Sequence, residues 1–452
     1  MSRAFVFMIT ALLAVACGYA PSVPSSAPSP TASTRPTDTG SIQPTPAAPQ
    51  AQLTEYLSTV ARDPATTATD GQLATAVASD EHFALNLYQQ LANGDGNVFM
   101  SPYSISTCLS MVLAGARGDT AIQLANALGV DDPDTWDAGR NRLDQSIGTG
   151  FSLPPQPDPS ATVQPLVLQT ANTMFGQTGY PFQQPFLDTL ARDYGSGLQG
   201  VDFATQWEAA RLAINDWVAV KTNQRILDLL PPGSVDDMTR SVLVNAIYFK
   251  ANWVRQFSPE ATRPAPFHLL DGSTIEAPTM NQNGMKFEFA QGTGWTAAVL
   301  PYYGASMLVI VPDEGKFGEI ERQLDAEFIS EVDSSMSERQ LTLSLPKFST
   351  EQSADLVDAL NALGVHDLFD QGKADLTGIE TVEPLYISHV EHKANISVDE
   401  HGTEAAAATA AVAEASSGAQ SATLNVDRPF LYLIRDSATN EILFMGRMVD
   451  PN

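Results

Sequence analysis

One stretch near the C-terminal end constrains the fold more than any other part of the chain. From Thr403 to Ala413 every side chain is alanine, threonine or valine except Glu404, and Glu414 follows directly. If the stretch formed a strand, its side chains would alternate between two faces. One face would carry only small residues and the other would carry both carboxylates. Because alanine favours helices over strands, the stretch can become a strand without any local preference for it.

Alanine-rich segments are usually surface helices or low-complexity linkers, and that interpretation has to be weighed first. A docked helix needs a stripe of large apolar side chains, and residues 403–415 contain no apolar side chain larger than valine. The residues on both sides of this stretch also have patterns typical of strands. Residues 385–390 and 394–398 alternate apolar and polar side chains, and residues 429–434 and 442–447 are apolar runs. We therefore expect a loop of small residues between core strands.

Six short motifs support one interpretation of the whole chain from about residue 78 onward. They are residues 97–105, 115–120, 245–250 with Trp253, 345–348, 400–409 and 427–431. In this order they resemble the signatures of the serpin family of serine protease inhibitors. The resemblance implies an α+β serpin fold with three β-sheets and about nine helices, in which a central five-stranded sheet dominates. It also implies an exposed reactive-centre loop near the C-terminus.

The same resemblance assigns roles to particular residues. The hinge of the loop would comprise Glu400, Gly402, Thr403, Glu404, Ala405, Ala406, Ala407, Ala408 and Thr409. A hydrogen-bonded "shutter" beneath the centre of the main sheet would comprise Ser101, Ser104, Asn245 and His392. The "breach", where the loop enters the top of the sheet, would contain Trp253 and Lys347, with Lys347 paired to Glu400.

The reactive bond follows from the family's usual spacing after the hinge, which places it between Ser416 and Ser417. The stretch up to Pro429 is longer than in familiar members, so Ala415 and Gly418 remain alternative cleavage residues. These small, neutral side chains suit elastase-like or subtilisin-like proteases. The absence of Arg and Lys between Lys393 and Arg428 argues against trypsin-like targets, and Glu414 leaves a glutamate-specific protease as a lesser option.

The function implied is that of a suicide inhibitor rather than an enzyme. A serine protease, or alternatively a cysteine protease, would attack the loop and be trapped as a covalent one-to-one complex. The alternative is a non-inhibitory serpin that acts as a binding or carrier protein. A third hypothesis, a secreted hydrolase, lacks any nucleophile or metalloprotease motif in the sequence.

The N-terminal segments are expected to lie outside the folded domain. Residues 1–16 read as a signal peptide, and Cys17 follows a sequence similar to a bacterial lipobox, although Ala14 stands where leucine is usual. Residues 17–50 are rich in Pro, Ser and Thr and read as a tether behind a lipidated Cys17. The alternative is an ordinary secretion signal cut after Ala16. Residues 51–77 form an extension whose order the sequence leaves open, and residues 78–452 form the serpin domain.

Composition restricts the partners. The chain has 52 Asp and Glu against 24 Lys and Arg, which argues against binding to nucleic acid or anionic lipid, and we expect a monomer that meets a membrane only through its N-terminal lipid. The two cysteines are Cys17 and Cys108, so lipidation would leave no disulfide, and Cys108 is expected to be buried.

No cofactor and no metal site are expected. His389 and His392 are three positions apart, which places them on opposite faces of a strand.

Overall fold

The computed structural model describes residues 51–149, 166–403 and 420–452. The predictions about residues 1–50, including the signal peptide and Cys17, therefore lie outside the described residues. The same holds for hinge residues 404–409 and for the reactive-bond candidates at 415–418. Among the helices that the structure describes, none combines the length and the apolar character needed to span a membrane.

Nine α-helices lie within the described ranges, in agreement with the expected number. They are α1 (Asp70–Leu91), α2 (Pro102–Gly115), α3 (Gly118–Leu128), α4 (Pro133–Ser146), α5 (Gln184–Tyr194), α6 (Phe203–Lys221), α7 (Phe317–Arg322), α8 (Ala326–Ser334) and α9 (Val357–Ala362). Short 3-10 helices occur at η1 (Ala65–Thr67), η2 (Pro259–Ala261) and η3 (Asp367–Phe369). Local signals set several ends: Thr69 and Gln72 form a capping box at the start of α1, and Gly129 ends α3 in the left-handed conformation.

The first sheet has seven strands in the order β1-β4-β3-β5-β13-β12-β11. Their bounds are β1 (Thr54–Tyr56), β3 (Val167–Gln177), β4 (Leu198–Val201), β5 (Ser241–Asn252), β11 (Phe348–Asp355), β12 (His389–Asp399) and β13 (Gly402–Thr403). Five of these are the strands of the expected central sheet. The other two are β1, an edge strand from the N-terminal extension, and the two-residue β13.

The second sheet has nine strands. They are β2 (Val98–Met100), β6 (Arg263–His268), β7 (Thr274–Gly292), β8 (Trp295–Pro301), β9 (Ala305–Pro312), β10 (Ser337–Pro346), β14 (Ser421–Asn425), β15 (Phe430–Asp436) and β16 (Ile442–Met448). The resemblance predicts three sheets in all, so two separate sheets are expected where the structure has this single nine-stranded sheet. The 19-residue strand β7 pairs with β6 and β10 along one part and with β8 along another, so its hydrogen bonds join both groups of strands.

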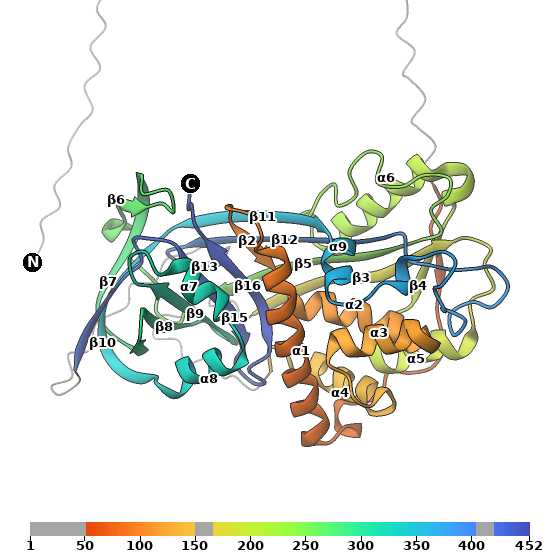
Figure 1. Ribbon diagram of the computed structural model, residues 1–452, viewed down its shortest axis with the longest axis horizontal. Coiled ribbons are helices and arrows are strands. Elements are labelled where there is room, and N and C mark those ends of the chain that lie inside the picture. Colours follow the sequence, from red (N-terminus) through yellow and green to blue (C-terminus); the bar gives the residue numbers. More distant parts are fainter. Residues whose placement is uncertain (1–50, 150–165, 404–419) are drawn as a thin grey trace, which may run out of the picture. The chain divides into compact units, whose positions relative to one another are not determined.

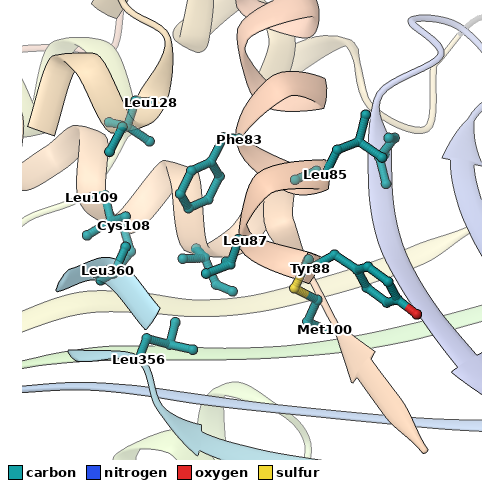
Figure 2. Packing of buried hydrophobic residues seen from close by; sticks show 14 of the residues in the cluster. Phe83, Leu85, Leu87, Tyr88, Met100, Cys108, Leu109, Leu128, Leu356 and Leu360 are labelled. Carbon is teal, nitrogen blue, oxygen red and sulfur yellow. The ribbon is translucent and has the colours of Figure 1, made fainter. Parts of the chain in front are cut away.

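Helices cover both faces of the seven-stranded sheet (Figure 1). On the face that we call inner, α1 and α2 pack with α9: Figure 2 shows Phe83 and Leu87 of α1 near Cys108 and Leu109 of α2 and Leu360 of α9. On the outer face, α6 buries its apolar side against β3 and β5. The expected α+β class is confirmed, and Cys108 is fully buried as expected.

Candidate functional site

The hinge begins as a strand inside the central sheet. In β13, Gly402 and Thr403 pair on one side with Asn252 and Ala251 of β5. On the other side they pair with β12, where Thr403 lies opposite Val398. The Thr403 side chain is completely buried, and its hydroxyl lies 3.0 Å from the Tyr302 hydroxyl. The chain therefore enters the sheet between β5 and β12 just before the segment of small residues.

Gly402 is required by this entry. Its φ is +141°, a backbone conformation that residues with a side chain rarely adopt. A Cβ atom at this position would lie 2.2 Å from the carbonyl oxygen of Ala251 and 2.8 Å from the Cα of Asn252. Because both are backbone atoms of the neighbouring strand, the clash could be relieved only by moving the strands apart.

Two predicted breach residues surround the entry point. The Trp253 ring stacks on Tyr302 with ring centroids 3.9 Å apart, and its indole N–H donates to the carbonyl oxygen of Asp399 at 2.9 Å. Lys347 Nζ lies 2.8 Å from the Glu400 carboxylate, which also accepts a bond from the Thr262 hydroxyl at 2.7 Å. Burial raises the pKa of Glu400, but these hydrogen bonds outweigh burial and hold it below its usual value. The ion pair therefore fixes Glu400, the first of the predicted hinge residues.

Below β13 the two strands meet again. Residues 389–395 of β12 pair in parallel with residues 242–248 of β5. Between this ladder and β13 the surface is hollowed by a cavity of about 120 Å³, whose lining includes Tyr248 and Phe249 of β5 with Asn395 and Ile396 of β12. The strands β5 and β12 are thus already separated where β13 lies between them, and they pair directly with each other over residues 242–248 and 389–395.

All four predicted shutter residues lie in one buried hydrogen-bond network under the closed part. His392 Nδ1 bonds to Asn245 Oδ1, and the backbone N–H of Ser101 donates to His392 Nε2 at 3.3 Å. Asn245 Nδ2 donates to the Ser104 hydroxyl at 2.8 Å and to Asn172 Oδ1 at 2.9 Å. The Ser104 hydroxyl in turn donates to Asn172 Oδ1 at 2.8 Å. Each of the four predicted shutter residues therefore has at least one hydrogen-bond partner within the network.

The network is consistent with a neutral imidazole at His392. Since Nε2 accepts from a backbone N–H, the ring proton belongs on Nδ1, where it can be donated to Asn245. Burial lowers the pKa of His392 to about 3, because a charged imidazolium would lose its hydration there.

A family model described as "Serpin (serine protease inhibitor)" matches residues 78–451. The chain belongs to the serpin family. Among curated serpins, the leukocyte elastase inhibitor of Equus caballus is 38% identical over 392 residues, which cover 84% of this chain and 100% of that protein.

Solved serpin structures have the same fold. Uncleaved ovalbumin superposes with a TM-score of 0.73 at 30% identity, covering 83% of this chain and 100% of ovalbumin. Thyroxine-binding globulin in complex with thyroxine also gives a TM-score of 0.73, at 27% identity, covering 84% of this chain and 100% of that structure.

Sequence reasoning missed three residues of the serpin site. Asn172 lies directly opposite Asn245 in the β3–β5 ladder, so it could have been found only from the register of the two strands. Tyr302 and Thr262 lie outside the six motifs and touch Thr403 and Glu400 only through the tertiary fold.

The segment 51–77, whose order the sequence left open, contributes β1, η1 and the first turns of α1.

Proposed function

We propose that this serpin is a suicide-substrate inhibitor of extracellular serine proteases that works by inserting its cleaved loop between β5 and β12. One observation carries the proposal: Thr403, the start of the small-residue segment, is already buried as a strand between β5 and β12. Cleavage downstream would release the far end of the loop and let this strand lengthen.

The register of β13 predicts where the inserted residues would lie. Thr403 pairs with Ala251 and Val398, and each later residue would move one position back along both antiparallel neighbours. Six positions on, Thr409 would lie between Asn245 (251 − 6) and His392 (398 − 6), which pair with each other in the present ladder. The Thr409 hydroxyl would thus enter the shutter network and offer a new partner to the two groups that insertion separates.

The same register explains the composition of the segment. Ala405 and Ala407 would share the inner face with Thr403 and meet the packed interior, where larger side chains would not fit. Glu404 would point to the outer face. A strand of about ten residues would complete about ten backbone hydrogen bonds, each worth about 1 kcal/mol net. The total is comparable with the stability of a whole domain, so the uncleaved form would be kinetically trapped.

The target class is inferred from the residues at the reactive bond. Ala415, Ser416 and Ser417 are small and uncharged, which suits the shallow specificity pockets of elastase-like or subtilisin-like enzymes. The similarity to leukocyte elastase inhibitors supports the same class. The lipobox-like sequence at Cys17 supports attachment to the outside of a cell membrane, with the tether of residues 17–50 between the lipid and the domain.

The direct test is to mix the purified protein with elastase and with subtilisin and to separate the products on denaturing gels. A band at the summed mass that survives boiling in detergent is the expected result. Mass spectrometry of the released C-terminal peptide would then identify the cleaved bond among residues 415–418. Clean cleavage by both proteases without such a band would instead favour the non-inhibitory alternative, a binding or carrier serpin.

A further inference from the structure

Three potential metal ligands meet on the outer face of β11 and β12. Asp355 lies directly opposite Glu391 in the antiparallel ladder, and His389 precedes Glu391 by two positions on the same strand. Positions i and i+2 of a strand and the position across from one of them share a face, so all three side chains point the same way. One ligand atom of each lies within 4.8 Å of the others.

Two of the three groups are held in place by their surroundings. The Asp355 carboxylate accepts backbone N–H bonds from Val357 at 3.1 Å and from Val390 at 3.4 Å. Its second oxygen lies 2.8 Å from His389 Nδ1. The two backbone bonds fix the orientation of the carboxylate in the way that surrounding groups orient metal ligands, whereas its contact with His389 would be replaced by shared coordination to the ion.

Glu391 supplies an independent reason to expect a ligand. Its side chain is 5% exposed, and among the residues that the structure describes no N–H or O–H group donates a hydrogen bond to its carboxylate, which His389 attracts only electrostatically. Lys393, two positions along β12, bonds instead to Glu351 and to the carbonyl oxygen of Leu227. A buried carboxylate that accepts no hydrogen bond is costly, and a bound cation would satisfy it.

We propose that Asp355, His389 and Glu391 bind a divalent transition-metal ion of the Zn²⁺ type. The donor set of one imidazole nitrogen and two carboxylate oxygens suits Zn²⁺ better than Mg²⁺ or Ca²⁺, which prefer oxygen alone. Asp236 also interacts electrostatically with His389 and adds negative charge near the site. Water would complete the coordination sphere on the exposed side, where Asp355 and His389 reach the surface.

The sequence alone predicts no metal site, because its histidine spacing brings no second ligand to His389. The grouping depends on the pairing of β11 with β12, which joins residues 34 positions apart. The site lies on the β11 side of β12, away from the β5 side where the loop would insert, so we expect it to be independent of insertion.

The test is calorimetric titration of the metal-free full chain with Zn²⁺, alone and in variants. The parent is expected to bind one equivalent in a saturable manner. Glu391→Gln and His389→Ala are each expected to weaken binding by at least about tenfold. His366→Ala is the matched control: this exposed histidine bonds to Asn361 and is not a member of the cluster, so its loss should leave Zn²⁺ binding unchanged.

Thermal unfolding separates loss of the site from loss of the fold. Without metal, Glu391→Gln should unfold at or above the temperature of the parent, because it removes a buried unpaired carboxylate. Added Zn²⁺ should raise the unfolding temperature of the parent and of His366→Ala but not of Glu391→Gln. The proposal is overturned if the parent shows no saturable Zn²⁺ binding, or if Glu391→Gln and His389→Ala bind Zn²⁺ as tightly as the parent.

Discussion

At the residue scale, Thr403 has no exposed surface, and its hydroxyl lies 3.0 Å from that of Tyr302. An arginine here would have to bury an unpaired charge for the strand to form, at a cost of several kcal/mol. We expect Thr403→Arg to turn the inhibitor into a substrate, so that the protease cleaves the loop and leaves. Denaturing gels should show at least about tenfold less covalent complex per cleaved chain, which corresponds to a difference of about 1.4 kcal/mol between the competing barriers.

Thr274→Arg provides the matched control, because Thr274 is an exposed strand residue of β7. This variant should trap protease like the parent. Full trapping by Thr403→Arg would contradict the insertion mechanism.

His392 makes the shutter sensitive to acid. Burial lowers the pKa of His392 to about 3 from an ordinary value of 6.5, so the folded state binds fewer protons than the unfolded state between these values. Its contribution to stability is therefore complete above pH 6.5 and is lost as pH falls toward 3, by about 1 kcal/mol per pH unit. Chemical denaturation at pH 7 and pH 5 should show a smaller loss for His392→Gln than for the parent. Equal losses would mean that His392 is not buried in its neutral form.

At the element scale, β13 depends on Gly402. Gly402→Ala would place a Cβ 2.2 Å from the Ala251 carbonyl oxygen and force a φ of +141° on an alanine. We expect the hinge to leave the sheet and the protein to lose about 1–3 kcal/mol of unfolding free energy. The fluorescence of Trp253, which stacks beside this strand, should change as well.

Gly315→Ala controls for backbone strain. Gly315 also has a positive φ, of +76°, but no atom lies within 4 Å of its potential Cβ. It should lose stability from strain alone and leave the fluorescence of Trp253 unchanged. If Gly402→Ala behaves in the same way, then contact with β5 does not fix the hinge.

The elements also show what sequence could and could not predict. Strand-like alternation predicted β12, because periodicity is a local property of the sequence. The family motifs predicted that Ser101, Ser104, Asn245 and His392 lie together. Asn172, Tyr302 and the Asp355–His389 pair were not predicted. These contacts join distant segments through strand register and packing, which leave no local pattern.

At the scale of the whole molecule, the described domain holds a sheet that is open at one end and closed at the other. The open end contains β13, and the closed end is held by the parallel ladder of residues 389–395 with 242–248 and by the shutter beneath it. Side chains of β12 also hold the segment after α6 over the outer face: Lys393 Nζ donates to the Leu227 carbonyl and Asn395 Nδ2 to the Arg225 carbonyl. Insertion would have to break these contacts first, which is the origin we propose for the kinetic barrier.

The central claim is that cleavage lets the loop complete the sheet, and comparing the thermal unfolding of the intact and the loop-cleaved protein tests it most directly. Completion of the sheet would add on the order of 10 kcal/mol, which predicts an unfolding temperature higher by about 10 °C after a single cut among residues 415–418. An unfolding temperature that stays the same or falls after cleavage would contradict the account.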